Sequence, residues 1–435
     1  MYPPQFSVVL LTTRRQKFWS LMDPNSLAIF PAATKILRNP DVEFKFRQDS
    51  NFWYFTQIAG PDHVLLLYKS ADNSLVEILF LNFPSADELV WNGPALSVEE
   101  ASFLSGVDKI LDVKNLQEYL QSYQKVSQVY FETKLSHLYL YSKLIKELFS
   151  DKIVSPADLM AQLRLSKDDS EIQLIKQSCQ INRKVFEKIE TVLEDYPHNI
   201  QELIGYRFGR NRKYLKESDL EAFILYIYNQ NGADWSFWPI VASGPNSTIL
   251  HSSKNNNEVL SGQLLLIDAG CEVLGYASDI TRTFKVGEVS EAQKLILAVV
   301  TELQREIIRF CSQNWFSKAS FSLMDIQEYT VNLVCQKLLD LGVIPNKSFS
   351  EIKEQQLYKK YYPHKVSHFL GLDVHDLRSD YTLNIPIQES MIFTIEPGLY
   401  FPKDDPEIPE EFRGVGVRVE DDILITEDGI VILTK

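Results

Sequence analysis

The chain has 435 residues, enough for two or three domains, and 45% of them are hydrophobic, as in a globular protein with a large core. Its formal net charge is −14, from 44 basic and 58 acidic residues, and no strongly basic patch or tail stands out. This balance argues against a nucleic-acid-binding protein, because such proteins usually carry a basic surface.

The four cysteines are widely scattered and form no CxxC pair, which argues against a thiolate zinc site. Their pattern is typical of reduced, intracellular cysteines. No apolar run approaches the length of a membrane span, and Phe6–Leu11 lacks the order of charged and apolar residues of a secretory leader. We therefore expect a cytoplasmic protein without a membrane partner, and a mitochondrial location stays open.

Short strands alternate with helical patterns in the first third of the chain. The predicted elements are strands at Ser26–Pro31, His63–Tyr68, Val76–Phe80 and Val126–Phe131, and helices at Asn115–Tyr123 and Ser136–Leu148. This alternation predicts an α/β domain with a mixed sheet.

The pattern changes near residue 160. A helix-like segment follows Pro156, and Lys167–Glu171 resembles the capped start of a long helix. We place the domain boundary here, which gives an N-terminal domain at 1–160 and a second domain at 161–435. Residues 197–217 are polar and locally basic, and they are predicted to form an exposed insertion. A helix is predicted at Ser218–Asn231.

Strand patterns dominate from Ile240 onward, apart from helices predicted at Ser290–Cys311 and Ser322–Leu341. The second domain is therefore predicted to have an α+β fold, in which helices cover one face of a largely antiparallel sheet.

Two aspartates lie on either side of a predicted turn at Val273–Gly275. Asp268 ends an apolar strand, and Asp279 lies in the strand that runs back. If the hairpin folds about Val273 and Leu274, the aspartates face each other with β-carbons roughly 5 Å apart. Two ionised carboxylates at that distance repel, so the pair needs a shared proton, an arginine or metal cations. A solvated acidic hairpin is the alternative.

Three histidines, His364, His368 and His375, cluster within twelve residues. The spacing of His364 and His368 on a helix would suit one metal ion, but the neighbouring proline and glycine favour extended chain. Each histidine taken alone could be an ordinary core or surface residue.

Further carboxylates lie in the apolar stretches MIFTIEPGLY and GVGVRVEDDILIT. Glu396 precedes a Pro-Gly turn, and a lone buried carboxylate is costly unless it is paired or bound to metal. Arg418 and Glu420 share one face of a strand with period two. The alternative for Glu396 is a position at the strand end in water. The alternative for the second stretch is a sheet with one solvated polar face. Asp421 and Asp422 are interpreted as structural or as solvated hairpin residues.

Four carboxylates and one imidazole can be combined into a single candidate metal site. Its members are Asp268, Asp279, His368, Glu396 and Glu420. Four negative charges match two divalent cations, and this ligand set suits Mn²⁺, or Co²⁺ and Zn²⁺ where available. A two-metal centre would lower the pKa of a bridging water and create a nucleophile near neutral pH.

The order DAG…SDITRTF, HxxxHFLGLDVHD, TIEPGLY and GVRVEDDILIT resembles the pita-bread-fold metallopeptidases, and within them the Xaa-Pro aminopeptidase (aminopeptidase P) family. The resemblance implies an α/β N-terminal domain with a mixed sheet, followed by an α+β pita-bread catalytic domain whose curved, largely antiparallel sheet is covered by helices. It also implies that Asp268 and Asp279 bind one metal ion, that His368 and Glu396 bind the other, and that Asp279 and Glu420 bridge the two.

The same resemblance assigns further active-site residues. His251 ends a segment that matches the family's block before the first aspartate, and it would line the substrate pocket. His364 and His375 match the remaining active-site histidines, and Arg418 matches the arginine beside the second bridging acid. In this family a hydroxide attacks the carbonyl before proline. By likeness Glu396 would shuttle the proton, and His375 would help to stabilise the oxyanion.

The first half of the chain also fits the family, since Phe46–Tyr54 resembles the signature of its N-terminal domain. Trp91 falls where some members place a tryptophan that reaches a neighbouring subunit's pocket, with local packing as the alternative. Tyr400 is also assigned to the substrate pocket. The likeness covers about 1–196 and 218–435. The departures at Ser252 and Lys365 remove no metal ligand.

The sequence thus predicts a metallo-exopeptidase that removes the N-terminal residue from peptides with proline at position 2. The family likeness implies a homodimer or homotetramer. A proline dipeptidase (prolidase) is the nearest alternative, because it shares the fold and the ligands. A non-catalytic pita-bread binding protein is a further alternative, although such relatives usually lose ligands and this chain keeps all five.

Overall fold

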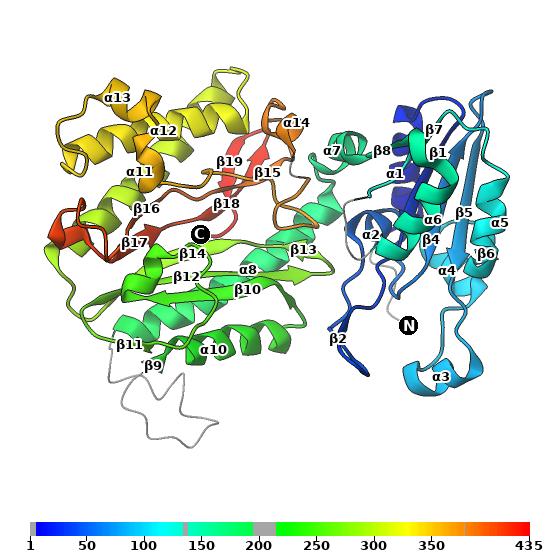
Figure 1. The fold of residues 1–435 in the computed structure, drawn as a ribbon, viewed down its shortest axis with the longest axis horizontal. Coiled ribbons are helices and arrows are strands. Elements are labelled where there is room, and N and C mark those ends of the chain that lie inside the picture. The colour runs from blue at the N-terminus through cyan, green and yellow to red at the C-terminus, as the bar shows by residue number, and fades with distance from the viewer. Residues whose placement is uncertain (1–5, 134–137, 195–214, 378) are drawn as a thin grey trace. The chain divides into compact units, whose positions relative to one another are not determined.

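The computed structural model describes residues 6–133, 138–194, 215–377 and 379–435, which fall into two compact units at 1–164 and 165–435 (Figure 1). We call these the N-terminal unit and the C-terminal unit, and describe each by itself. The insertion predicted at 197–217 lies outside the described residues as far as residue 214. Of its last three residues, Leu215 and Glu217 are buried.

A six-stranded mixed sheet lies at the centre of the N-terminal unit. Its strands are, in sheet order, β6 (Ile110–Asp112), β5 (Leu75–Leu81), β4 (Val64–Lys69), β1 (Ser26–Pro31), β7 (Gln128–Tyr130) and β8 (Ile153–Val154). Strand β1 pairs antiparallel with β4 and parallel with β7. The mixed sheet predicted from the sequence is therefore confirmed.

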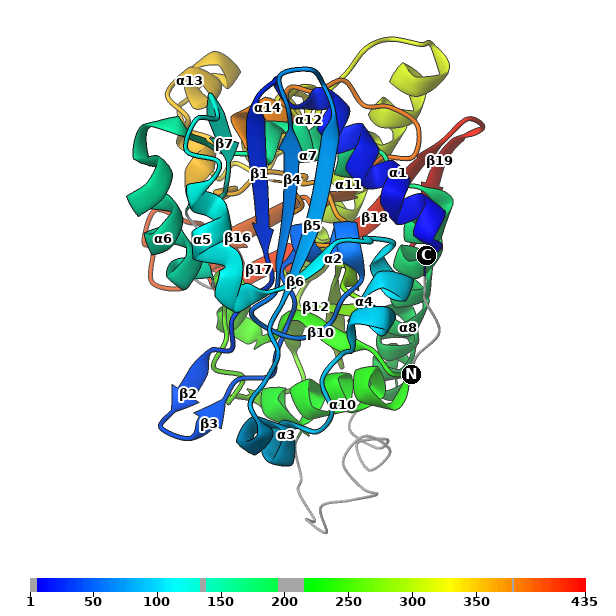
Figure 2. The ribbon, with the colours of Figure 1, turned by 90° about the vertical axis from the view of Figure 1, so that its right-hand side faces the viewer.

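Helices cover both faces of this sheet. Side chains of α5 (Leu116–Gln121) and α6 (Tyr139–Phe149) share a buried cluster with β1, β4 and β5. On the other face, Phe18 of α1 (Val8–Leu21) and Phe55 of α2 (Ser50–Thr56) contact each other and Phe30 of β1. Figure 2 shows these helices on either side of the strands. The unit also contains β2 (Leu37–Asn39), β3 (Val42–Glu43), α3 (Ala86–Asn92), α4 (Val98–Ser105) and α7 (Ala157–Arg164).

Every strand pairing among the described residues of the C-terminal unit is antiparallel. Its strands are β9 (Leu215–Lys216), β10 (Asp234–Ser243), β11 (Glu258–Val259), β12 (Gln263–Val273), β13 (Tyr276–Ala277), β14 (Ile280–Val286), β15 (Ile392–Ile395), β16 (Gly398–Phe401), β17 (Val415–Arg418), β18 (Asp421–Thr426) and β19 (Gly429–Ile432). Strands β10, β12, β13 and β14 form one group, and β15, β18 and β19 form another.

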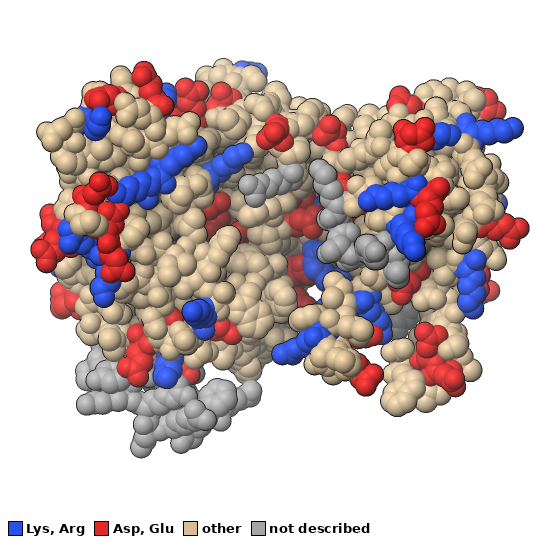
Figure 3. All heavy atoms as spheres, viewed as in Figure 1, with Lys and Arg blue, Asp and Glu red and all other residues tan. Residues whose placement is uncertain are grey.

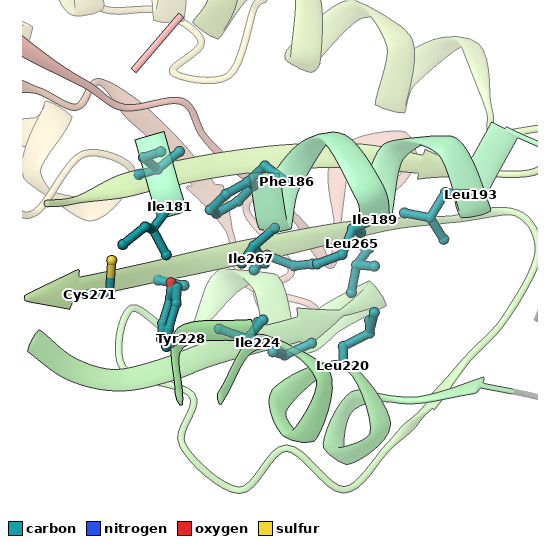
Figure 4. Close-up of a cluster of buried hydrophobic side chains, with 14 of the residues drawn as sticks. Ile181, Phe186, Ile189, Leu193, Leu220, Ile224, Tyr228, Leu265, Ile267 and Cys271 are labelled. Carbon is teal, nitrogen blue, oxygen red and sulfur yellow. The ribbon is translucent and has the colours of Figure 1, made fainter. Parts of the chain in front are cut away.

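Helices α8 (Asp169–Glu194) and α10 (Glu217–Gln230) pack on one face of the β10–β12–β14 group. Odd-numbered residues of β12, among them Leu265, Ile267 and Cys271, point into this core (Figure 4). Successive side chains of a strand point to opposite faces, so the even-numbered residues, including Asp268, lie on the other face. The remaining helices are α11 (Glu291–Phe316), α12 (Leu323–Asp340), α13 (Phe349–Glu354) and α14 (Asp380–Leu383).

The hairpin between β12 and β14 has a different register from the one expected. Asp268 pairs with Thr281 rather than with Asp279. The turn lies at Leu274 and Gly275, which have φ values of 52° and 87°, so it falls one residue later than predicted. Two consecutive positive φ values are those of a type I′ turn, whose twist matches that of the two strands it joins. The residue opposite Asp268 changes from Asp279 to Thr281, a shift of two positions. Both aspartates therefore stay on one face of the sheet.

The surface carries charges of both signs. On the face drawn in Figure 3, acidic and basic side chains are interspersed rather than gathered into one basic region. Among the described residues, none of the helices has the combination of length and apolarity needed to cross a membrane.

Candidate metal centre

The two strand groups of the C-terminal unit meet along β14, and this contact brings Glu420 to the aspartate hairpin. The Glu420 main-chain N–H donates to the Thr281 carbonyl at 3.0 Å, and the Thr281 hydroxyl donates to Glu420 Oε2 at 2.7 Å. The Thr283 hydroxyl donates to the Arg418 carbonyl at 2.9 Å. Thr281 and Thr283 lie on the face opposite to the α8 core, so Glu420 and Arg418 are held on the face that carries Asp268.

The predicted ligands converge at this point. Asp279, His368 and Glu420 place one ligand atom each within 4.8 Å of one another. His368 Nε2 lies 3.6 Å from Asp279 Oδ2 and 3.6 Å from Glu396 Oε1. These separations exceed hydrogen-bond distances, and they are short enough for one ion to contact several of the groups.

Main-chain contacts orient the His368 ring. Thr394 in β15 donates its N–H to the His368 carbonyl at 2.9 Å, and its hydroxyl accepts from the His368 N–H at 3.3 Å. His368 Nδ1 lies 3.1 Å from the Phe369 carbonyl, which can only accept, so Nδ1 carries the proton. Nε2 is then unprotonated and faces the carboxylates, and this is the tautomer that binds a metal ion.

The carboxylates cannot all be ionised without compensation. Burial raises the pKa of Glu396 to about 8, with the charge of Arg418 opposing this rise and the charge of Asp268 adding to it. Burial and then the charges of Glu420 and Asp268 raise the pKa of Asp279 well above its usual range. The pKa of Glu420 is raised in the same way, by burial and by Glu396. Protons or cations must therefore balance this cluster.

The oxygens that lack hydrogen bonds fit metal ions. Asp268 Oδ1, Asp279 Oδ1 and Glu420 Oε1 are buried, and none of them has a hydrogen-bond partner within the described part of the chain. Leaving a buried carboxylate oxygen unsatisfied is costly, whereas a divalent cation would satisfy all three at once. Oxygen donors with one imidazole are also the set that Mn²⁺ and similar ions accept.

Arg418 joins the metal ligands to the neighbouring strand β16. Its Nη2 donates to Asp268 Oδ2 at 2.6 Å, its Nη1 to the Tyr400 hydroxyl at 3.0 Å and its Nε to the Thr281 hydroxyl at 3.1 Å. Arg418 and the three side chains that it contacts are all buried, so the guanidinium is a fixed positive charge inside the cluster. It leaves Asp268 with one free oxygen that can bind a metal ion.

His364 is held neutral beside Glu396. Its Nδ1 lies 2.8 Å from the Lys365 carbonyl and therefore carries the proton, so Nε2 accepts from the Tyr400 hydroxyl at 2.9 Å. Burial, together with the smaller effects of Arg418 and His251, lowers the pKa of His364 to about 4. His364 Nδ1 is 3.6 Å from Glu396 Oε2. A hydrogen-bonded path thus runs from Asp268 through Arg418 and Tyr400 to His364.

The two remaining predicted histidines lie at the exposed rim. The His375 ring lies 4.3 Å from that of His368, centroid to centroid. His251 is exposed in the segment after the turn Gly244–Thr248, and its effect on the pKa of His364 links it to the cluster. Trp91 belongs to the N-terminal unit, where its side chain is 86% exposed on α3, so local packing does not explain it.

Two aspartates that follow Glu420 are buried, so of the two interpretations given for them the structural one is confirmed and the solvated one is wrong. Asp421 forms an ion pair with Arg282 at 2.6 Å, and Asp422 accepts from the Asp279 main-chain N–H at 3.0 Å. Thr281 was also missed by sequence reasoning. Its place two residues after Asp279, on the same strand face, is the signal that could have indicated it.

Comparisons with known proteins agree along nearly the whole chain. Residues 173–427 match the model of metallopeptidase family M24, and residues 11–130 match the aminopeptidase P N-terminal domain. The chain is 32% identical to human Xaa-Pro aminopeptidase 3, over 99% of this chain and 84% of the relative. It is 32% identical to the Xaa-Pro aminopeptidase of Escherichia coli strain K12, over 96% of this chain and 92% of the relative.

Solved structures show the same likeness. Zinc-substituted E. coli aminopeptidase P in complex with product matches with a TM-score of 0.85 and 30% sequence identity. The match covers 99% of this chain and 95% of that structure. The likeness therefore includes both units.

Proposed function

The chain belongs to metallopeptidase family M24, and on this premise we propose that it cleaves the N-terminal Xaa-Pro bond of peptides with two divalent metal ions bound in the cluster described above. It is a metallo-exopeptidase of the Xaa-Pro aminopeptidase type, with the predicted α/β N-terminal domain and pita-bread catalytic domain. The observation that carries the proposal is that Asp279, His368 and Glu420 place ligand atoms within 4.8 Å of one another, while three buried carboxylate oxygens of the cluster lack hydrogen-bond partners among the described residues.

The ligand assignment follows the contacts in the cluster. We assign Asp268 and Asp279 to one ion and His368 and Glu396 to the other, with Asp279 and Glu420 shared between them. The 3.6 Å separation of His368 Nε2 from both Asp279 and Glu396 supports this division. The oxygen-rich set favours Mn²⁺ over Co²⁺ and Zn²⁺ as the native ion. Metal analysis of the purified protein would test that choice.

Bound divalent ions would supply a water of lowered pKa and an electrophile for the substrate carbonyl. The protein's own groups hold and move protons around that chemistry. Glu396 can take up a proton on its carboxylate and deliver it to the leaving proline nitrogen. Neutral His364, fixed by Tyr400 and Lys365, lies beside that carboxylate, with its Nδ1 3.6 Å from Glu396 Oε2.

The exposed rim provides the substrate-facing groups. His375 lies against the ring of His368 and can donate to a carbonyl oxygen as negative charge develops there. His251 lies near His364 and would contact the peptide. Tyr400 and Trp91 are assigned to the substrate pocket, with Trp91 acting from a neighbouring copy of the chain.

An aminopeptidase and a proline dipeptidase are separated by substrate length. With Mn²⁺ added, we expect the tripeptide Arg-Pro-Pro to be cleaved after arginine, and an Arg-Pro dipeptide to be cleaved more slowly. Glu396→Gln should remove this activity, and Glu389→Gln, a matched change on the surface, should not. Cleavage of the dipeptide alone would overturn the aminopeptidase assignment.

Assembly and location are also proposals. The exposed indole of Trp91 supports a homodimer or homotetramer, and light scattering with Trp91→Ala would test it. All four cysteines are buried and free, which supports the reducing cytoplasm. Cell fractionation would separate this location from a mitochondrial one.

A further inference from the structure

A buried ion pair lies next to His375 in the chain and is not part of the predicted site. Lys167 Nζ lies 3.3 Å from Asp376 Oδ2, and both side chains are only 1% exposed. Asp376 directly follows His375, whereas Lys167 belongs to the short segment before α8. Two charges are costly to bury unless they are paired, so this contact is a firm link between two distant segments.

The main chain around Lys167 is fixed against a strand that holds a metal ligand. The Lys167 N–H donates to the Ser390 carbonyl at 2.9 Å, and Ser166 forms an antiparallel bridge with Met391. Ser390 and Met391 directly precede β15, the strand that holds the His368 main chain. The Lys167 ammonium group therefore has a defined position relative to His368.

A loop that begins after His368 brings His375 back beside it. The Asp376 N–H donates to the Phe369 carbonyl at 2.9 Å, so the loop closes on the residue that follows His368. The rings of His368 and His375 are consequently 4.3 Å apart, centroid to centroid. The Asp376 side chain adds a second anchor at the end of this loop, on the residue next to His375.

Gly371 of the same loop provides the space for the ion pair. A Cβ atom at this position would collide with Asp376 Oδ2 and would lie 3.2 Å from Lys167 Cε. The Gly371 carbonyl also accepts from the Ala277 N–H at 2.9 Å, which ties the loop to the aspartate hairpin. The ion pair therefore packs directly on the main chain of the loop that carries His375.

We propose that Lys167 and Asp376 are positioning residues, which hold His375 where its ring can donate to the carbonyl oxygen of a bound peptide. This proposal rests on the proposed function, because it takes His375 as the group that stabilises the developing negative charge. Such stabilisation depends strongly on geometry, since a displacement of about 1 Å can reduce the rate by roughly 100-fold. In this role neither member of the pair needs to contact the substrate or a metal ion.

The first test compares turnover with metal binding. Lys167→Met keeps the apolar part of the side chain and removes the ammonium group. With Mn²⁺ added, we expect kcat for Arg-Pro-Pro to fall by about 10- to 100-fold and KM to change by less than about threefold, because the lost interaction acts in the transition state. Mn²⁺ affinity, measured by calorimetry, should keep its wild-type value. Lys347→Met, which breaks an exposed pair with Glu351, should alter none of these quantities.

A second variant separates positioning from stability. Lys167→Met removes the partner of a buried carboxylate, so its melting temperature should fall. Combining Lys167→Met with Asp376→Asn removes the buried charge as well. The melting temperature should then recover while kcat stays low. Recovery of kcat together with the melting temperature would show a structural role alone and would overturn the proposal.

The decisive comparison is made in a His375→Ala background. If Lys167 acts through His375, adding Lys167→Met to His375→Ala should reduce kcat no further. Equal fold-reductions in both backgrounds, or a loss of Mn²⁺ affinity that matches the loss of kcat, would overturn the positioning role and leave the proposed function intact. A wild-type protein that binds Mn²⁺ and cleaves no peptide would instead refute the proposed function, and the positioning role with it.

Discussion

Asp268 of strand β12 pairs with Thr281 of strand β14, and Asp279 lies two residues before Thr281 on the same face of the sheet. The two aspartates are therefore diagonal neighbours, for which Cα atoms are roughly 7–8 Å apart rather than directly opposed. A diagonal arrangement leaves room for an ion between the carboxylates. It also lets the Thr281 hydroxyl donate to Glu420, so the Glu420 carboxylate lies on the same face as the two aspartates.

The close approach at Gly270 maintains this arrangement. A Cβ atom there would collide with the Ser278 carbonyl oxygen, the Ser236 hydroxyl and the Phe237 ring. Gly270→Ala should push the strand carrying Asp279 away, destabilise the protein by about 1–3 kcal/mol and weaken Mn²⁺ binding. Gly342→Ala, at a positive φ with open space around it, should cost stability and leave Mn²⁺ affinity unchanged. Urea denaturation and metal titration would measure both effects.

Asp279→Asn should separate metal binding from folding. The change removes one of the mutually repelling carboxylates, so the metal-free protein should become more stable. The same change should abolish binding of the full metal complement and cleavage of Arg-Pro-Pro. Metal content by mass spectrometry, thermal melting and peptide assays would check the three outcomes. Wild-type activity in Asp279→Asn or Asp279→Ala would rule out the two-metal mechanism.

Arg418→Met should be strongly destabilising in the absence of metal. It leaves Asp268 Oδ2 without its donor and removes the buried positive charge, so we expect a loss of about 3–5 kcal/mol in the free energy of unfolding. Added Mn²⁺ should restore part of this loss, because cations compensate the same carboxylates. Arg309→Met breaks an exposed pair with Glu306 and should change stability by about 1 kcal/mol or less. Equal effects of the two substitutions would contradict the role given to Arg418.

His63 makes the stability of the N-terminal unit depend on pH. Burial lowers the pKa of His63 to about 4, and its Nδ1 accepts from the Asn82 main-chain N–H at 3.0 Å. The unfolded chain takes up a proton below about pH 6.5, and the folded chain does so only near pH 4. The contribution of His63 to the free energy of unfolding is therefore complete above pH 6.5. It is lost as the pH falls, and the loss reaches about 3 kcal/mol at pH 4.

Denaturation of the full chain at several pH values would measure this loss. His63→Gln keeps an acceptor and does not titrate, so the difference between variant and wild type should shrink steadily from pH 7 to pH 4. A difference that stays constant over this range would show that His63 does not titrate as described.

The sequence indicated which residues lie close together better than it indicated their geometry. Asp279, His368 and Glu420, chosen from residue types and order, do converge, but the register of the hairpin depended on the turn. Leu274 has a positive φ, which a leucine rarely adopts, so the sequence favoured a turn one residue earlier. The burial of Asp421 and Asp422 could not be read locally either, because their partners Arg282 and Asp279 come from segments more than a hundred residues away.

Several helices escaped prediction although their start signals are present. Helices α3, α4 and α13 each begin with a capping box, in which a serine and a glutamate three residues later cap each other's main chain. Helix α2 is capped by Asp49, the residue before its first turn, whose side chain accepts from the Asn51 and Phe52 N–H groups. These helices are short, so apolar periodicity gave no clear signal.

The distribution of the ligands along the chain also constrains how the protein can be made. Asp268 and Glu420 are separated by most of the C-terminal unit, and Glu420 is followed by only the last two strands. A ribosome must therefore synthesise the chain as far as Glu420 before all five proposed ligands are present. Domains fold as units in order of synthesis, so the N-terminal unit can fold long before any metal ion is captured. A chain interrupted before Glu420 would therefore lack one of the five proposed ligands.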